Sequence, residues 1–303
     1  MKNMTRKLLL LFAVLSLPLA GLAQPGKITA PDLKIPALTL SNGVKMPALG
    51  FGTFTLKGDT AEKSVATAIS LGYRLIDTAA IYGNEEAVGA GIRKSGVDRS
   101  TLFITTKLWE SDAGYENAKK VLETSMKKLG VKYVDLYLIH WPRGDIKGSW
   151  KAMEALYEAG KAKAIGVSNF EPEQLKELMK TARIKPMVNQ IEFHPFFQQK
   201  AAQEANEKLG IKVQAWSPFA QGRNNLFTNP TLQAIAKKHN KTVAQVTLRW
   251  EVQNGLSTIP RTSERAEMAE NLGIFDFTLD AADMEKISTL DTKTSLFPEW
   301  RKK

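Results

Sequence analysis

The sequence predicts an α/β protein whose main domain is a (β/α)8 barrel of the TIM type. Short apolar runs typical of strands alternate with amphipathic helical stretches from residue 48 onward, in eight successive units. Such barrels usually need about 250 residues, and this chain has 303. Several polar side chains stand where predicted strands end, and in a barrel those ends meet on one face. An open doubly wound sheet is the alternative, but Gly50-Phe-Gly52 lacks the third glycine of its phosphate-binding turn.

The first 23 residues have the pattern of a cleaved signal peptide. Lys2, Arg6 and Lys7 precede a ten-residue apolar run at 8–17, and small residues follow up to Ala23. We therefore expect cleavage after Ala23 and export to the periplasm, with no stable membrane insertion afterwards. A retained membrane anchor is the alternative, but the run is shorter than the roughly 20 residues that span a bilayer. If the pattern is misleading, the protein is cytoplasmic.

The next elements are a tether at 24–37 and the barrel domain at 38–303. Asn42-Gly43 lies between short alternating runs and predicts a β-hairpin with a type I′ turn, which would close the bottom of the barrel. The predicted barrel strands are Ala48–Gly52, Arg74–Asp77, Leu102–Lys107, Val134–His140, Ala164–Ser168, Met187–Glu192, Val213–Ser217 and Ser257–Pro260.

Apolar residues at helical spacing predict helices over 60–71 and 117–129. Ser168-Asn169 is a suitable N-cap for the helix that Pro172 begins, and Asp280 for a last helix over 280–290. That helix and the tail after it exceed the eight units. We expect the tail, with Leu296, Phe297 and Trp300, to lie over the barrel mouth.

Composition limits the function. The chain has no cysteine, which excludes disulfides and thiolate nucleophiles, and its three scattered histidines predict no metal site. The formal charge is +11, and removing the three bases of residues 1–23 leaves 11 − 3 = +8. Because the basic residues are spread along the chain without a dense run, we expect a solvated surface and no nucleic-acid partner.

Four side chains at or just beyond successive predicted strand ends suggest proton delivery to a carbonyl oxygen. A free tyrosine has a pKa of about 10, and a nearby lysine ammonium is expected to lower it. An aspartate would pair with that lysine and fix its position, and a histidine would orient the carbonyl. These expected catalytic residues are Tyr82, Lys107, Asp77 and His140. Alone, each could be a cap, a surface residue or a core residue; together they indicate carbonyl reduction.

From about Leu38 to Phe297 the chain resembles the aldo-keto reductase family. The stretch Gly72 to Glu85 with Val88-Gly89 matches the family's first signature, and Gly166-Val-Ser-Asn-Phe170 matches the second. The resemblance places the family's catalytic tetrad on the four residues named above. Two segments, 214–223 and 290–297, look closest to bacterial 2,5-diketo-D-gluconate reductase-like members.

The resemblance also implies a nicotinamide cofactor, NADPH or NADH, bound without a Rossmann fold. Trp216 would stack on the nicotinamide, Ser168, Asn169 and Gln190 would hold its carboxamide, and the segments 52–54 and 217–223 would wrap the pyrophosphate. The full expected set is Gly52, Thr53, Asp77, Ser168, Asn169, Gln190, Trp216, Ser217, Phe219, Arg223, Pro260, Arg261, Thr262, Glu267, Glu270 and Asn271.

The third family signature departs from the usual Ile-Pro-Lys-Ser pattern of NADPH-preferring members. Arg261 keeps the first cation, but Glu267 stands where those members have an arginine for the 2′-phosphate. A carboxylate there would repel a phosphate and accept hydrogen bonds from ribose hydroxyls. We therefore hypothesise that NADH serves as well as, or better than, NADPH; alternatively, Arg265 replaces the missing arginine and nothing changes.

The substrate is expected to be a small carbonyl compound. The candidate contacts are Phe54, Tyr82, Trp109, His140, Trp141 and Phe297, although surface aromatics can also be simple packing. The sequence leaves aldoses, keto-sugars and methylglyoxal open. A non-catalytic cofactor-binding module and another barrel chemistry remain as alternative functions, and family resemblance implies a monomer. Export would also separate the protein from the usual nicotinamide pool.

Overall fold

The computed structural model describes residues 35–301. The expected signal peptide at 1–23 and most of the expected tether at 24–37 lie outside the described residues. Within the described part, no helix has the length and apolarity needed to cross a membrane. That part also contains no group of three acidic or histidine side chains arranged to hold a metal ion.

The N-terminal hairpin is present, but its turn differs from the prediction. Strands β1 (Ala37–Thr39) and β2 (Lys45–Pro47) pair antiparallel. The Gly43 N–H donates to Leu40 O at 2.9 Å, and Gly43 has a φ of 87° while Asn42 does not have a positive φ. A type I′ turn needs positive φ at both central residues, so this loop is instead a type I turn followed by a left-handed glycine.

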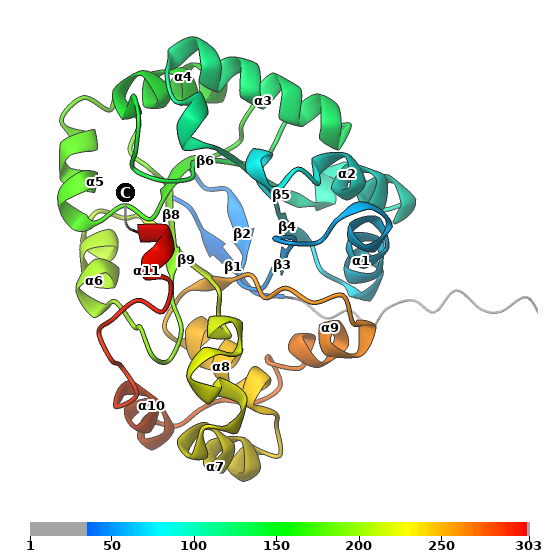
Figure 1. Cartoon of the computed structure of the whole chain (residues 1–303), viewed down its shortest axis with the longest axis vertical. Coiled ribbons are helices and arrows are strands. Elements are labelled where there is room, and N and C mark those ends of the chain that lie inside the picture. Colours follow the sequence, from blue (N-terminus) through cyan, green and yellow to red (C-terminus); the bar gives the residue numbers. More distant parts are fainter. Residues whose placement is uncertain (1–34, 302–303) are drawn as a thin grey trace, which may run out of the picture. The chain divides into compact units, whose positions relative to one another are not determined.

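The predicted barrel is confirmed. Eight parallel strands follow one another in chain order around the centre of Figure 1. A parallel bridge between Leu49 and Thr258 joins the first strand region to the last and closes the sheet. The barrel strands are β3 (Phe51–Gly52), β4 (Leu75–Asp77), β5 (Phe103–Leu108), β6 (Leu136–Ile139), β7 (Ile165–Ser168), β8 (Val188–Glu192), β9 (Lys212–Trp216) and β10 (Ser257–Thr258).

Helices surround the strands in Figure 1. The predicted helices over 60–71 and 117–129 are α1 and α3, whose apolar faces pack against the sheet. The helices are α1 (Gly58–Leu71), α2 (Glu85–Lys94), α3 (Tyr115–Leu129), α4 (Ile146–Glu158), α5 (Pro172–Met179), α6 (Lys200–Lys208), α7 (Pro230–His239), α8 (Val243–Gln253), α9 (Arg265–Leu272), α10 (Ala281–Ser288) and α11 (Pro298–Arg301). Short 3-10 helices are η1 (Ala80–Tyr82), η2 (Arg99–Thr101), η3 (Glu110–Asp112) and η4 (Ala220–Thr228).

One predicted helix cap is right and one is wrong. Asp280 accepts the Asp283 N–H at 2.9 Å and caps α10 as expected. The cap of α5 is Glu171, whose N–H donates to Gln174 Oε1 at 2.9 Å, and not Ser168-Asn169. Proline at the first helical position fixes the cap at Glu171, two residues beyond the expected polar pair, and that pair lines the cavity instead.

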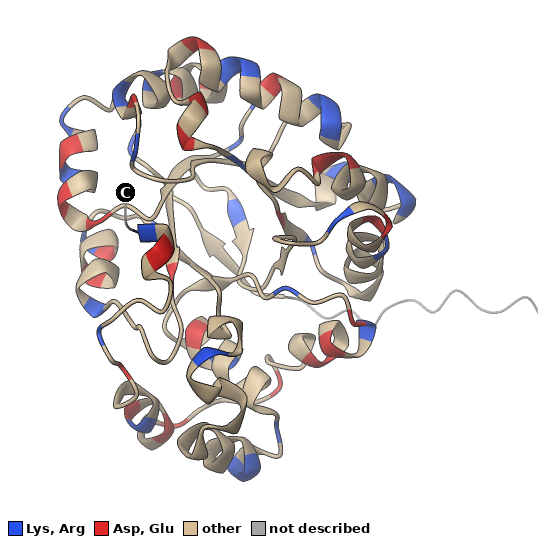
Figure 2. Ribbon diagram, in the orientation of Figure 1, with Lys and Arg blue, Asp and Glu red and all other residues tan. Residues whose placement is uncertain are grey.

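Charged residues of both signs are interspersed over the outer helices (Figure 2). Several form exposed pairs one helical turn apart, such as Lys176 with Glu173 at 2.8 Å. Such pairs contribute little stability but keep the surface solvated.

Candidate active site

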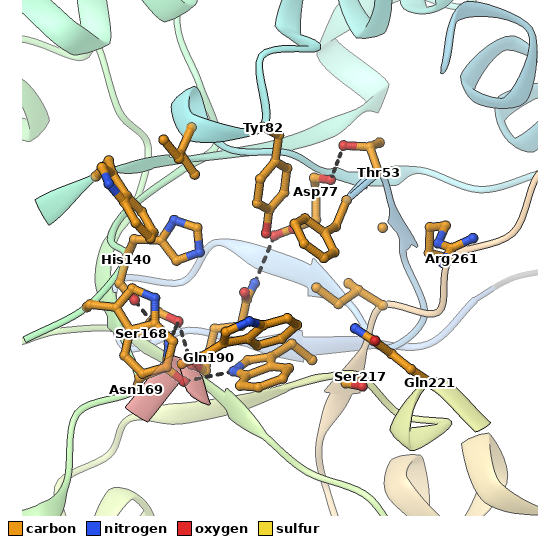
Figure 3. A pocket seen from close by; sticks show the side chains of 18 of the residues that line it. Thr53, Asp77, Tyr82, His140, Ser168, Asn169, Gln190, Ser217, Gln221 and Arg261 are labelled. Carbon is orange, nitrogen blue, oxygen red and sulfur yellow. Dashed lines mark hydrogen bonds between the residues drawn. The ribbon is translucent and has the colours of Figure 1, made fainter. Parts of the chain in front are cut away.

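Residues from the carboxyl ends of the strands line a cavity of about 410 Å³. Asp77 ends β4, Ser168 ends β7 and Trp216 ends β9, so three strands deliver side chains to one rim. Figure 3 shows Tyr82, Asp77 and His140 bordering the cavity, with Ser217, Gln221 and Arg261 across from His140. These residues therefore lie on one face of the barrel, as the sequence predicted.

Lys107 is the centre of the polar network. Its Nζ lies 2.5 Å from Asp77 Oδ1, 2.9 Å from Thr78 O and 3.5 Å from Tyr82 Oη. Lys107 is fully buried and its amino group still keeps its proton: burial would lower the pKa of Lys107, but Asp77 and Tyr82 beside it outweigh burial and raise it. Because an ammonium only donates, Lys107 uses the phenol oxygen as acceptor and leaves the Tyr82 hydrogen free to be donated.

Lys107 lowers the pKa of Tyr82, as the sequence predicted, but the net pKa of Tyr82 is nevertheless raised. Burial raises the pKa of Tyr82, and the opposing charge of Lys107 offsets this only in part. The phenol is therefore neutral at neutral pH and can act as a proton donor. The nearby ammonium still favours the phenolate that remains after the proton has left.

His140 is neutral in this environment. Burial and the charge of Lys107 hold the pKa of His140 well below its usual range. Its ring meets Tyr82 edge-on with 5.7 Å between ring centroids, and it meets Trp109 at 5.1 Å. Its Nδ1 is buried with no partner among the described residues. A neutral imidazole beside the phenol can hydrogen-bond a carbonyl oxygen without adding a positive charge to the cavity.

A chain of hydrogen bonds fixes the opposite wall. Gln190 Nε2 donates to Asp77 Oδ2 at 2.8 Å and to Gln214 Oε1 at 2.7 Å. Trp216 Nε1 donates to Asn169 Oδ1 at 2.8 Å, which fixes the indole plane at the cavity. Ser168 Oγ donates to the Gln190 carbonyl at 2.7 Å. Gln190 is thus tied to the charged pair, a link that its place at a strand end alone did not indicate.

The cavity has features that fit a nicotinamide dinucleotide. Ser217 Oγ is buried without a partner among the described residues, and the residue has a φ of 56°, which holds it in a left-handed turn after β9. The exposed Arg261 supplies a cation. At Gly52 a Cβ would lie 2.8 Å from the Ile259 carbonyl, so only glycine lets these two segments meet there. An unsatisfied hydroxyl, an aromatic face and a cation suit this class of ligand.

Most of the expected site residues line this cavity. They are Gly52, Thr53, Phe54, Asp77, Tyr82, Trp109, His140, Trp141, Ser168, Asn169, Gln190, Trp216, Ser217, Phe219 and Arg261. Lys107 lies directly behind Asp77 and Tyr82. The expected residues that the structure places outside the lining are Arg223, Pro260, Thr262, Glu267, Glu270, Asn271 and Phe297.

Two of those outlying residues have identifiable partners in the C-terminal tail. Arg223 donates to Leu296 O and lies 2.9 Å from Glu299 Oε1, so in this structure its guanidinium contacts the tail. Phe297 is fully buried and stacks on Trp300 with 4.8 Å between ring centroids. The ring that borders the cavity is that of Trp300.

Sequence reasoning missed three residues that shape the site. Arg143 lines the cavity and donates to Trp300 O at 2.9 Å. Asn84 is buried and its Nδ2 donates to Thr53 O at 2.9 Å, joining the loop after β3 to the segment that carries Tyr82. Gln214 partners Gln190. The position of Gln214 within a predicted strand could have suggested an inward polar side chain, whereas Arg143 and Asn84 lie in loops without any such periodicity.

Fold and site together define a barrel oxidoreductase that reduces carbonyl groups. Over residues 48–292 the chain matches the Aldo/keto reductase family, and it belongs to that family. It is 51% identical over 261 residues to glyoxal reductase of Bacillus subtilis, covering 86% of this chain and 94% of that one.

Solved structures show the same relationship. An aldo/keto reductase from Brucella melitensis is 46% identical with a TM-score of 0.82, covering 85% of this chain and 100% of that one. An aldo-keto reductase from Bombyx mori in complex with NADP is 35% identical with a TM-score of 0.83, covering 88% and 96%. This chain is thus an NAD(P)H-dependent oxidoreductase of carbonyl compounds. The expected closeness to 2,5-diketo-D-gluconate reductase-like members stays a prediction.

Proposed function

We propose that this enzyme reduces small 2-oxoaldehydes, such as methylglyoxal, at one carbonyl group. The size of the cavity carries the proposal. Ligand pockets commonly enclose about 300–1,000 Å³, and this one encloses about 410 Å³. It must hold the nicotinamide ring and the reacting carbonyl together, which leaves room for a compact substrate. The similarity to a glyoxal reductase supports the same class.

The proposed roles follow from the geometry of the four central side chains. The bound nicotinamide supplies the hydride for the carbonyl carbon. Tyr82 donates its phenolic proton to the carbonyl oxygen, while Lys107 at 3.5 Å stabilises the phenolate that develops. Asp77 holds Lys107 charged and in place, and neutral His140 orients the carbonyl oxygen beside the phenol.

We further propose that Glu267 relaxes the preference for NADPH. Glu267 is exposed and accepts a hydrogen bond from Thr262 Oγ1, so its carboxylate is fixed at the start of α9. A fixed negative charge beside a 2′-phosphate would raise the free energy of NADPH binding, and NADH, which lacks that phosphate, would not be penalised. Arg265 is exposed on the same helix, and its movement toward the phosphate is the competing possibility.

Location and assembly are also proposals. The signal-like pattern of residues 1–23 supports export to the periplasm, and family membership supports a monomer. A mature form beginning at Gln24 in a periplasmic fraction would support export, and a full-length cytosolic form would contradict it.

The substrate proposal is tested by measuring NADPH and NADH oxidation separately with methylglyoxal, glyoxal and a bulky aryl ketone. We expect kcat/KM for the two small dicarbonyls to exceed that for the ketone by at least about tenfold, or about 1.4 kcal/mol. A preference for the aryl ketone would contradict the argument from cavity size. Turnover is measured both for the intact chain and for a chain that begins at Gln24.

A further inference from the structure

Glu192 is a buried carboxylate whose position the reaction does not explain. It ends β8, two residues after Gln190, and is fully buried. Side chains two apart on a strand point to the same face, so Glu192 stands one step nearer the rim than Gln190. It is absent from the cavity lining. A buried carboxylate needs hydrogen-bond donors for its oxygens, and the segments that supply the donors indicate the role of Glu192.

Three of the donors to Glu192 come from the C-terminal tail. Ser295 Oγ lies 2.5 Å from Oε2 and the Leu296 N–H donates to Oε1 at 2.9 Å. Arg301 Nε lies 3.4 Å from Oε2. The fourth donor, His194 Nε2 at 3.1 Å, belongs to the barrel. Burial alone would raise the pKa of Glu192, but the hydrogen bonds from His194, Ser295 and Leu296 hold it below its usual value.

Docking of the tail on Glu192 places an aromatic wall at the cavity. Trp300 lies in the chain between Leu296 and Arg301, and its ring centroid is 5.6 Å from that of Trp216 and 5.8 Å from that of Phe54. Phe54 in turn lies 5.0 Å from the ring of Tyr82. The ring of Phe54 therefore lies between Trp300 and Tyr82, the proposed proton donor. In Figure 1 the short helix α11, which carries Trp300, lies beside the ends of β8 and β9.

The tail is also held by the fully buried ring of Phe297 and by the hydrogen bond from Arg143 to Trp300 O, whereas its other ion pairs are more accessible to solvent. Arg223 and Glu299 form a half-exposed pair, and so do Arg301 and Glu171. Ion pairs of this kind contribute little because water screens them. Glu192 differs because undocking the tail would leave its buried charge with one donor in place of four.

We propose that Glu192 is a positioning residue, which fixes the segment Ser295–Arg301 on the barrel rim and thereby holds Trp300 as the wall that limits substrate size. The inference rests on the proposed reduction of small carbonyls in this cavity. It assigns to the end of β8 two separate tasks. Gln190 orders the charged pair inside the barrel, and Glu192 orders the tail that covers it.

The test compares wild type with Glu192→Gln and Ser295→Ala, and uses Glu171→Gln as the matched control. Glu192→Gln keeps the size of the side chain but removes its charge, and Ser295→Ala removes one tail donor without altering the barrel. Glu171→Gln removes the charge that Arg301 pairs with and keeps a side-chain oxygen to cap α5. Hydrogen exchange of the segment 292–301 reports docking, and kcat and KM for methylglyoxal and an aryl ketone report size selection.

In both Glu192→Gln and Ser295→Ala we expect exchange at the Leu296 amide to accelerate at least tenfold. The ratio of kcat/KM for aryl ketone to that for methylglyoxal should rise at least fivefold, mainly through KM, with kcat of Ser295→Ala within twofold of wild type. Glu171→Gln should resemble wild type in both measurements. Unchanged exchange in Ser295→Ala and Glu192→Gln, or accelerated exchange with an unchanged substrate ratio, would overturn the proposal.

Two safeguards keep the test decisive. If Glu192→Gln does not fold, Ser295→Ala and Arg301→Ala carry the comparison, since both change the tail alone. If wild type reduces no small carbonyl, the substrate proposal fails by itself. Unchanged exchange would then refute the anchoring by Glu192, whereas accelerated exchange would support it independently of the substrate.

Discussion

Removing both partners of the buried pair between Asp77 and Lys107 is expected to destabilise the fold by less than the sum of the two single removals. The two groups lie 2.5 Å apart, with side-chain exposures of 3% and 0%. At an effective dielectric constant of about 20, their attraction is about 6–7 kcal/mol. Desolvation offsets much of this, and losing one partner of a buried pair typically costs about 3–5 kcal/mol. We therefore expect this cost for Asp77→Asn and, separately, for Lys107→Met.

The double variant removes both charges, so no buried charge remains unpaired. Its loss of stability should fall short of the sum of the two single losses by at least about 2 kcal/mol. Urea unfolding followed by tryptophan fluorescence measures all four proteins. The exposed pair of Lys176 and Glu173 provides the control cycle, with an expected coupling below about 0.5 kcal/mol. Additive losses within about 0.5 kcal/mol at Asp77 and Lys107 would refute the reasoning.

Three further predictions concern stability and cofactor choice. Asn84→Ala should lose about 2–4 kcal/mol in urea unfolding, because it removes three buried hydrogen bonds between loops; a loss below about 1 kcal/mol would count against this role. Burial raises the pKa of Glu251 well above its usual value, so the stability associated with this group is present below the unfolded-state pKa of about 4.3 and is lost as pH rises toward the folded-state pKa. The free energy of unfolding of Glu251→Gln should accordingly increase relative to that of wild type as the pH rises from 5 to 8. A constant difference in unfolding free energy over that range would argue against it. Glu267→Arg should raise the ratio of NADPH to NADH kcat/KM at least about tenfold, whereas Glu264→Arg should change it little, and equal changes in both would reject the assignment.

The sequence predicted the barrel and its central site because both depend on local patterns. The periodicity of apolar residues predicts the alternation of strands and helices. The place of Asp77 and Lys107 in the site follows from their positions at or near strand ends. The hairpin position was also readable from Asn42-Gly43. Its turn type was not, since the positive φ falls on glycine alone and this depends on the register of the strands.

The remaining features depend on contacts between distant segments. Arg223 was expected at a cofactor phosphate, but in the structure it contacts Glu299, which lies 76 residues away in the chain. The net pKa shift of Tyr82 depends on how deeply the barrel buries it, and spacing along the chain carries no measure of burial. The choice of Trp300 over Phe297 as the cavity wall likewise depends on how the tail docks.

The central claim is that the phenol of Tyr82 delivers the proton. Its most direct test measures methylglyoxal reduction and cofactor binding by Tyr82→Phe, with Tyr133→Phe as the control that removes a phenol outside the cavity lining. We expect Tyr82→Phe to lose at least about 100-fold in kcat while its cofactor dissociation constant, followed by tryptophan quenching, stays within about threefold of wild type. Tyr133→Phe should retain both. A Tyr82→Phe enzyme with kcat near that of wild type would contradict the account.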